Sequence, residues 1–255
     1  MNPDQPKKKK CRADQILVNL GLAATLEEAQ SLIMAGRVYS GEKRVNKAGT
    51  PLSPDTPLRV AEKTPEYVSR GGEKLAHALK YFMVDPTGWI ALDAGASTGG
   101  FTDCLLHAGV KKVYAVDVGY GQFDPRLRAD PRVVPMERFN VRRLLPEDLD
   151  EEMDLVVADL SFISLTMVIP ALEKVVKSGG RLLVLIKPQF EVKKEEVGPG
   201  GVVREPEKHQ AVIEKITVFS RNLGLKPLGV TESPLKGPKG NREFFLALEK
   251  TSAPD

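Results

Sequence analysis

The chain has 255 residues, long enough for one large domain or for a medium domain beside a small one. Apolar residues make up 42% and charged residues 28%, which excludes wholesale disorder and collagen-like or low-complexity chains. The net charge is only +3, but residues 1–80 hold 14 Lys and Arg against 9 Asp and Glu, while the rest holds 23 against 25. This excess of positive charge is typical of an N-terminal region that binds a polyanion, or of a solvated basic tail.

The N-terminal segment is predicted to be a basic tail rather than a targeting signal. Lysines fill positions 7–10, but polar residues follow where a signal peptide needs an apolar segment. The longest apolar run, 182–186, is far shorter than the roughly 18–20 residues of a membrane-spanning helix. Only Cys11 and Cys104 are present, so a disulfide framework has no support. We expect a cytoplasmic protein that uses no membrane and no obligate protein partner.

Residues 12–60 carry the pattern of two short helices followed by a small sheet. The first helix ends before Gly21. The second begins with a capping box of Thr25 and Glu28 and ends at Gly36. Short apolar runs separated by Gly and Pro then predict strands at 38–39, 45 and 58–60. We therefore expect a small α+β domain.

A set of positions in this stretch has the spacing of a known family. The matching residues are Arg12, Asp14, Leu17, Gly21, Leu22, Ala29, Leu32, Ile33, Gly36, Val38, Lys47 and Gly49. They resemble the S4 RNA-binding domain, whose second helix usually opens with a Ser-Arg pair where this chain has Thr25-Leu26, so one RNA-contacting Arg is absent. Taken singly, the remaining cations are ordinary surface charges, but together they favour contact with RNA phosphates. The expected contacts are Arg12, Arg37, Lys43 and Arg44.

From residue 69 onward, strand-like and helical stretches alternate. The strands are expected at 89–92, 112–116, 132–135, 155–158, 181–186, 225–232 and 243–248. The helices between them are expected at 72–82, 100–106, 163–176 and 206–223. This alternation predicts a doubly wound, Rossmann-like α/β sheet of seven strands that binds ligands at the carboxyl ends of its strands. No helix separates the last two strands, so we expect the last strand to be antiparallel.

A glycine-rich turn follows the first of these strands. There the backbone can approach a ligand closely, and the amides at the following helix start attract a carboxylate or phosphate. Asp117 ends the next strand, where its carboxylate can accept both hydroxyls of a ribose. The pair favours an adenosine-containing ligand over a turn that binds nothing. Because the GxGxxG and GK[ST] patterns are absent, S-adenosylmethionine fits better than NAD or ATP.

The residues expected to contact this cofactor come mainly from the turn itself. Asn140 follows the third strand and is expected beside the adenine. The full set comprises Asp93, Gly95, Ser97, Thr98, Gly99, Gly100, Phe101, Asp117 and Asn140.

Four charged residues stand at strand or helix ends of the same domain. Asp159 and Lys187 each end an apolar strand, Lys74 opens a helix, and Glu243 starts a strand. A lysine directly after five apolar residues is expected to project into the cleft at the carboxyl edge of the sheet. Taken alone, Lys74 and Glu243 would be ordinary surface charges.

Long motifs of this domain resemble the TlyA family, which also carries the label hemolysin. They are residues 69–75, 93–103, 186–191, 197–204 and 236–241. The family joins an S4 domain to an FtsJ-like methyltransferase domain, and the resemblance extends from residue 12 to residue 250. The polar residues 62–66 break the periodicity and predict a linker. We therefore expect a basic tail and S4-like domain at 1–62, a linker at 63–68 and an FtsJ-like methyltransferase domain at 69–251.

The resemblance also implies an activity. FtsJ-like ribose methyltransferases use a Lys-Asp-Lys-Glu tetrad, which corresponds here to Lys74, Asp159, Lys187 and Glu243. We therefore expect S-adenosylmethionine-dependent 2′-O-methylation of ribosomal RNA at a cytidine, with ribosomal RNA or ribosomal subunits as partners. Arg70 is a further expected RNA contact.

The tetrad suits chemistry on a ribose hydroxyl. A 2′-hydroxyl is a weak nucleophile, so its attack on a methyl group needs a placed base and an in-line geometry. Lys187 is the natural candidate, either as the base or as the group that orients the hydroxyl. Burial and the second cation Lys74 would favour its neutral form, whereas Asp159 and Glu243 would oppose it.

Two other functions stay open. One is an S4-type RNA-binding protein with a catalytically silent methyltransferase scaffold, which the complete tetrad argues against. The other is a membrane-lytic hemolysin, for which the chain lacks a spanning segment, a secretion signal and a long amphipathic pattern.

The remaining motifs are less informative. Residues 198–201, beside Lys193, Lys194 and Arg204, are compatible with a lid that closes on RNA or with a plain flexible loop. The three histidines are scattered and lie far from the cysteines, so no metal site is predicted.

Overall fold

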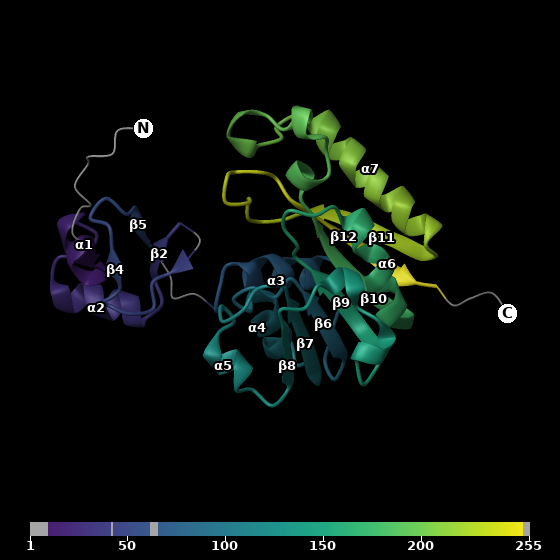
Figure 1. Cartoon of the computed structure of the whole chain (residues 1–255), viewed down its shortest axis with the longest axis horizontal. Coiled ribbons are helices and arrows are strands. Elements are labelled where there is room, and N and C mark those ends of the chain that lie inside the picture. The colour runs from purple at the N-terminus through teal and green to yellow at the C-terminus, as the bar shows by residue number, and fades with distance from the viewer. Residues whose placement is uncertain (1–9, 42, 62–65, 252–255) are drawn as a thin grey trace. The chain divides into compact units, whose positions relative to one another are not determined.

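The computed structural model describes residues 10–41, 43–61 and 66–251. The chain divides into two compact units, Met1–Glu66 and Tyr67–Asp255 (Figure 1). Residues 7–9 of the predicted basic tail and residues 63–65 of the predicted linker lie outside the described residues. Each unit has its own hydrophobic core.

The first unit packs two helices, α1 (Ala13–Asn19) and α2 (Leu26–Met34), with a sheet of three short strands. The Thr25 hydroxyl accepts a hydrogen bond from the Glu28 backbone N–H at 3.1 Å, as the capping box predicts. The strands are β2 (Val38–Ser40), β3 (Lys43–Arg44) and β5 (Leu58–Val60). The strand that was expected at Val45 is β3, which ends at Arg44, one residue earlier. The Val45 side chain that follows it is packed into the core. Two strands, β1 (Cys11–Arg12) and β4 (Pro51–Leu52), were too short for a pattern to reveal.

The second unit is built on a sheet of seven strands. They are β6 (Ile90–Ala94), β7 (Lys112–Asp117), β8 (Val133–Glu137), β9 (Met153–Ala158), β10 (Val176–Ile186), β11 (Leu225–Glu232) and β12 (Phe244–Lys250). Their order in the sheet is β11-β12-β10-β9-β6-β7-β8. β12 runs antiparallel to both β10 and β11, while the other pairings are parallel. The predicted fold, including the antiparallel last strand, is confirmed.

Five helices accompany this sheet. They are α3 (Gly71–Tyr81), α4 (Gly100–His107), α5 (Pro125–Arg128), α6 (Ile169–Val175) and α7 (Pro206–Asn222). The single helix predicted over 163–176 is wrong in its first part, where a separate 3₁₀ turn, Leu165–Met167, precedes α6. Pro170 explains the break, because proline has no N–H and fits only the first turn of a helix.

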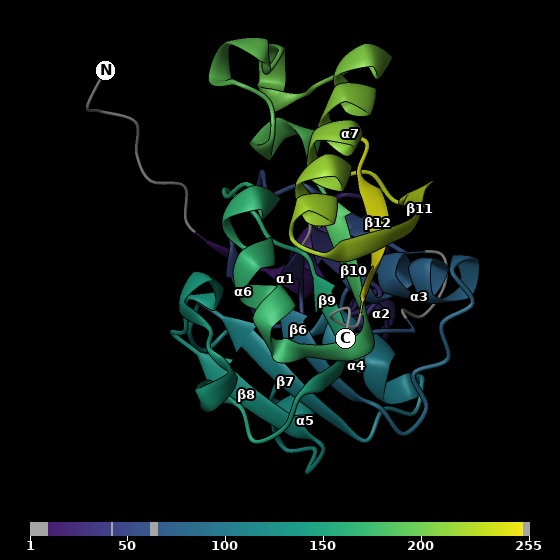
Figure 2. The ribbon, with the colours of Figure 1, turned by 90° about the vertical axis from the view of Figure 1, so that its right-hand side faces the viewer.

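The sheet is buried on both faces, as its apolar strands require. Leu182, Val184 and Ile186 of β10 belong to the core on the side of α6 and α7. Leu183 and Leu185 alternate with them and belong to the core on the side of α3 and α4 (Figure 2). The run of five apolar residues therefore belongs to a strand in the middle layer of a three-layer domain.

The second unit already includes Tyr67 and Val68, which the sequence pattern assigns to the linker. Both side chains are buried in the core on the side of α3 and α4. The Val68 backbone N–H donates to Asp103 Oδ2 at 2.7 Å. Because the residues before them in the sequence are polar, the sequence pattern did not show that Tyr67 and Val68 belong to the core. Among the described residues, no helix combines the length and the apolar composition that crossing a membrane requires.

Candidate active site

The topology of the sheet brings three of the four tetrad residues to one edge. Asp159 follows the last residue of β9, and Lys187 follows the last residue of β10. Glu243 precedes the first residue of β12, and because β12 is antiparallel, its start meets the end of β10, with Ile186 opposite Phe244. Asp159 and Glu243, which are 84 positions apart in the sequence, are thus brought to the same edge of the sheet. Lys74 reaches the same edge from the first turn of α3.

The four side chains form a continuous series of ion pairs. Lys74 Nζ lies 2.7 Å from Glu243 Oε2 and 3.9 Å from Asp159 Oδ2. Lys187 Nζ lies 2.5 Å from Asp159 Oδ1 and donates a hydrogen bond to Ser161 Oγ at 2.9 Å. Charges therefore alternate along the series Glu243, Lys74, Asp159 and Lys187.

The two ends of this series differ in burial. The Glu243 side chain is 1% exposed and that of Lys74 is 6% exposed, so their charges are compensated almost wholly by each other and by Asp159. The Asp159 side chain is 20% exposed and that of Lys187 is 10% exposed. A molecule that approaches from solvent therefore meets Asp159 and Lys187 first.

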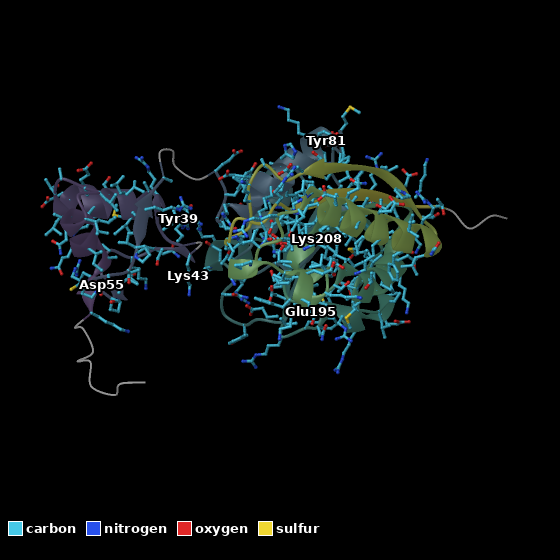
Figure 3. All side chains as sticks on the ribbon, turned by 90° about the horizontal axis from the view of Figure 1, so that it is seen from above. Tyr39, Lys43, Asp55, Tyr81, Glu195 and Lys208 are labelled. Carbon is cyan, nitrogen blue, oxygen red and sulfur yellow. The ribbon has the colours of Figure 1, made fainter. Side chains whose placement is uncertain are left out.

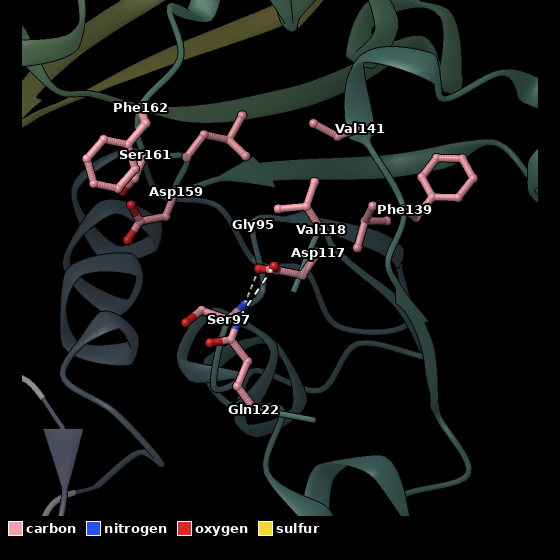
Figure 4. A pocket seen from close by; sticks show the side chains of 12 residues that line it. Gly95, Ser97, Asp117, Val118, Gln122, Phe139, Val141, Asp159, Ser161 and Phe162 are labelled. Atoms are coloured by element: carbon pink, nitrogen blue, oxygen red, sulfur yellow. Dashed lines mark hydrogen bonds between the residues drawn. The ribbon is translucent and has the colours of Figure 1, made fainter. Parts of the chain in front are cut away.

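A pocket of about 360 Å³ lies next to the open end of the series (Figure 4). Its lining residues come from the glycine-rich turn, the end of β7, the segment after β8 and the segment after β9. They are Gly95, Ser97, Val116, Asp117, Val118, Gln122, Phe139, Val141, Asp159, Leu160, Ser161 and Phe162. Because Asp159 belongs to both the pocket and the ion-pair series, the two features form one site.

The carboxylate of Asp117 is held in the pocket by three hydrogen bonds. It accepts hydrogen bonds from the backbone N–H groups of Ser97 at 2.7 Å and Gly119 at 2.6 Å. The Gln122 side-chain amide donates a longer bond at 3.4 Å (Figure 4). The carboxylate is thereby held at the carboxyl end of β7 and faces the glycine-rich turn.

Two glycines of the turn are required by close packing. Gly95 has φ +89°, and a Cβ there would lie 2.6 Å from the carbonyl oxygen of Asp159. Gly99 has φ +98° and a Cβ there would lie 2.3 Å from Leu127. Both the left-handed backbone and the lack of space exclude other residues. The turn can therefore pass directly under the segment that carries Asp159.

Asp93 lies beneath the pocket and does not line it. The side chain is fully buried, and Oδ2 accepts a hydrogen bond from the Thr102 hydroxyl at 2.7 Å. Burial raises the pKa of Asp93 to about 7, and the nearby carboxylates of Asp159 and Asp117 add to the shift. Its contribution to the site is therefore support of the turn from below.

The other predicted cofactor contacts of the turn also lie outside the pocket lining. Gly100 allows Ser69 Oγ to approach, and the Phe101 ring packs beside Phe245 in the core, 6.1 Å between centroids. The carbonyl of Thr98 accepts a hydrogen bond from the Asp124 backbone N–H at 3.2 Å. Asn140 caps a 3₁₀ turn through the Arg142 N–H and lies between two pocket residues, Phe139 and Val141.

The sequence pattern missed the segment that follows Asp159. Ser161 and Phe162 line the pocket, and the Phe162 side chain is 90% exposed although it is a large aromatic. Phe162 has φ +64°, a conformation that costs an ordinary residue about 1–2 kcal/mol. Ser97, across the pocket, has φ +50°. Strain at two lining residues is typical of a functional site.

The predicted RNA-binding cations of the first unit have distinct surroundings. Arg12 forms a two-pronged pair with the buried carboxylate of Asp14, at 3.0 and 2.6 Å, which holds the pKa of Asp14 below its usual value. Arg37 donates to the Ala61 carbonyl at 2.7 Å, and Arg44 to Asn46 Oδ1 at 2.8 Å. Lys43 is exposed in β3, in the same small sheet as Tyr39 (Figure 3). Arg70, in the second unit, stands directly before α3.

Comparison with protein families identifies both units. A family model described as FtsJ-like methyltransferase matches residues 67–250, and an S4 domain model matches residues 11–57. The chain belongs to the FtsJ-like methyltransferase family and carries an S4 domain in its N-terminal part.

Individual relatives are similar over nearly the whole chain. A Bacillus subtilis protein named as a candidate rRNA methyltransferase, YqxC, is 47% identical over 241 residues, which cover 94% of this chain and 86% of the relative. TlyA of Mycobacterium tuberculosis, a 16S/23S rRNA (cytidine-2′-O)-methyltransferase, is 46% identical with coverage of 94% and 90%. A solved structure of a candidate hemolysin from Streptococcus thermophilus has a TM-score of 0.76 at 42% identity and covers 96% of this chain and 90% of that chain. The family resemblance seen in the sequence is confirmed.

Proposed function

We propose that the protein transfers a methyl group from S-adenosylmethionine to the ribose 2′-hydroxyl of a cytidine in ribosomal RNA. The observation that carries this proposal is the series of ion pairs from Glu243 to Lys187, which ends at the pocket beside Asp159. The substrate is supported by the M. tuberculosis relative, which is named for cytidine-2′-O-methylation of 16S and 23S rRNA. Ribosomal RNA or a ribosomal subunit is then the partner, and the cytoplasm the location.

The pocket residues fit S-adenosylmethionine. A carboxylate has about four lone-pair positions, and the Ser97 and Gly119 N–H groups use two of those on Asp117. The long bond from the exposed Gln122 amide occupies a position that a ribose hydroxyl would take. Val118, Phe139 and Val141 give an apolar wall for a flat adenine ring. When bound, S-adenosylmethionine supplies an electrophilic methyl group on a positively charged sulfur.

The tetrad divides into groups that touch the substrate and groups that support them. We assign Asp159 and Lys187 as catalytic residues, because they are the less buried pair of the tetrad and Asp159 lines the pocket. We assign Lys74 and Glu243 as positioning residues, because they are buried and reach the pocket only through Asp159. Removal of either would leave a buried charge without its partner.

The contact between Lys187 Nζ and Asp159 Oδ1, at 2.5 Å, fixes the position of the Lys187 amino group. As an ammonium ion, Lys187 donates a hydrogen bond to the 2′-oxygen and orients it; as a neutral amine it would accept the hydroxyl proton. The two roles differ in pH dependence. The single-turnover rate of a base rises with pH through its own titration, whereas that of an orienting ammonium does not.

The exposed ring of Phe162 is placed to stack on a nucleobase that binds next to the tetrad. This ring is exposed at the pocket mouth and leans on Phe190, with 5.0 Å between the ring centroids. RNA-binding proteins use such rings to stack on unpaired bases. The strained backbone at Phe162 is the cost of presenting the ring to solvent.

The test is methylation of purified ribosomal subunits. Each subunit is incubated with tritiated S-adenosylmethionine, and the labelled nucleotide is mapped and its ribose analysed. We expect label at a cytidine 2′-oxygen with the parent protein and none with Lys187→Ala. Label on a base, or equal label with Lys187→Ala, would contradict the proposal.

A further inference from the structure

Two loops beside the tetrad are joined into one unit, which we call the clasp. One is residues 198–204, which precede α7, and the other is residues 233–242, which connect β11 to β12 (Figure 1). Asn241 Oδ1 accepts a hydrogen bond from the Val203 N–H at 3.0 Å, and Asn241 Nδ2 donates to the Gly201 carbonyl at 2.9 Å. One side chain of the second loop thus bonds the first loop in both directions.

A second buried bond fixes the same point. The Val203 carbonyl accepts a hydrogen bond from His209 Nε2 of α7 at 2.9 Å. Asn241 is 2% exposed and His209 is 3% exposed, so water does not compete for these bonds. The sequence allowed a lid or a flexible loop at residues 198–201, and the loop that contains them is held at Val203 on both its N–H and its carbonyl.

The clasp forms the wall of the active site on the Glu243 side. Asn241 stands two residues before Glu243, and a Cβ at Gly237 would lie 2.5 Å from Glu243 Oε1. The backbone of the second loop therefore rests directly against the buried end of the tetrad. The cofactor pocket lines the other end, at Asp159.

The clasp presents two exposed lysines that form no ion pair with the described acidic side chains. They are Lys236 and Lys239. By contrast, Arg242 pairs with Glu232 and Lys208 pairs with Glu205. The turn that carries the two lysines is closed by the bonds from Gly237 N–H to the Asn241 carbonyl and from Gly240 N–H to the Gly237 carbonyl.

Lys239 also lies against the first loop. Its Nζ would be 3.2 Å from a Cβ placed on Gly201. The first loop ends at Arg204, which is also exposed. The backbone that carries these cations is already fixed, so little backbone conformational entropy is lost when they bind.

We propose that the clasp binds phosphate groups of the RNA strand that carries the target ribose, through Lys236 and Lys239. This inference rests on the proposed function and adds a second RNA-binding surface, on the methyltransferase unit itself. A ribose whose 2′-hydroxyl reaches Lys187 brings its own strand along the rim of the tetrad. Unpaired lysines on that rim match the charge of the strand.

The test compares two double variants of the full-length protein. Lys236→Ala with Lys239→Ala removes the proposed contacts. Lys111→Ala with Lys226→Ala removes two exposed lysines at the opposite edge of the sheet, where β7 and β11 begin. We measure binding of purified ribosomal subunits as a function of salt, and KM and kcat for the subunit that the parent protein methylates.

Each lost contact at an exposed site is expected to weaken binding about 5-fold, so the clasp variant should raise KM about 25-fold with little change in kcat. Its salt dependence should lose about 0.7 in slope for each phosphate on a single strand. The control variant should match the parent. Equal binding and slope in the clasp variant and the control would overturn the inference. Binding is measured without methyl transfer, so failure of the proposed function, seen as no methylation of either subunit, is a separate result.

A third variant tests whether the hydrogen bonds of Asn241 hold the clasp in the form that binds RNA. Asn241→Asp keeps an acceptor for Val203 N–H but places a carboxylate oxygen against the Gly201 carbonyl in place of a donor. We expect a smaller rise in KM than for the double lysine variant, with unchanged affinity for S-adenosylmethionine. If Asn241→Asp lowers cofactor affinity instead, the clasp acts on the pocket and its assignment to RNA is wrong.

Discussion

The two ends of the active site are built in opposite ways. The cofactor pocket uses backbone groups, and the residues that form its floor and its main acceptor, from Gly95 to Gln122, are close in the sequence. The tetrad uses charged side chains from four segments spread from Lys74 to Glu243. The pocket is therefore sensitive to changes of shape, and the tetrad to changes of charge.

The largest expected effect on turnover is that of Lys187→Ala. Loss of a base or of an orienting group costs about 10²–10⁴-fold in rate. Cofactor affinity should stay unchanged, because Lys187 does not line the pocket. Single-turnover methylation at saturating cofactor checks the rate, and a variant within about threefold of the parent would remove Lys187 from catalysis.

Gly95→Ala should disrupt the pocket through shape alone. The new methyl group meets the Asp159 carbonyl at 2.6 Å, and overpacking of this kind costs about 1–3 kcal/mol beyond the strain of the left-handed backbone. Gly88→Ala is the matched control, since Gly88 has a similar φ of +76° with open space around it. Cofactor affinity by calorimetry and unfolding in urea should separate the two. Equal losses in both variants would mean that backbone strain, and not the contact with Asp159, is the cause.

Asp117→Ala should weaken cofactor binding with a smaller effect on the fold. Each hydrogen bond to a charged group contributes about 1.5–3 kcal/mol, and the variant also frees the Ser97 and Gly119 N–H groups. Calorimetric titration with S-adenosylmethionine measures the loss. An unchanged affinity would show that the cofactor binds elsewhere.

Asp93→Asn tests the buried support beneath the turn, and it has the smallest expected effect. The pKa of Asp93 is about 7 in the folded protein and about 3.8 when unfolded, so the folded state binds the extra proton. Stability from this group is therefore present below about pH 4 and is lost as the pH rises to about 7. Asp93→Asn should flatten that decline in urea unfolding measured between pH 4 and pH 8. A variant whose stability changes with pH in the same way as that of the parent would contradict the raised pKa.

The sequence predicted most of what depends on local pattern. The apolar strands and the glycine-rich turn are visible because periodicity and turn chemistry are local properties. Lys187 stood out because it follows five buried residues, whereas Lys74 and Glu243 had no local signal and were found only through the family resemblance. Their closeness depends on the antiparallel pairing of β12 with β10.

Other features could not be predicted for the same reason. The role of Asn241 requires knowing that Val203 lies beside it, 38 positions earlier in the chain. The exposure of Phe162 contradicts its apolar character, so a pattern search assigns it to the core. Asp93 was expected to contact the cofactor, and its burial under the turn follows from the packing of Thr102, which the motif does not encode.

The position of Glu243 at the start of the last strand has a consequence for how the enzyme matures. During synthesis the chain emerges from its N-terminus, and the residues that line the pocket, up to Phe162, precede Glu243 by more than 80 positions. A nascent or prematurely ended chain that lacks β12 has every pocket residue but leaves Lys74 without its buried carboxylate. The tetrad is therefore complete only after the segment that carries Glu243 has been made and β12 has paired with β10.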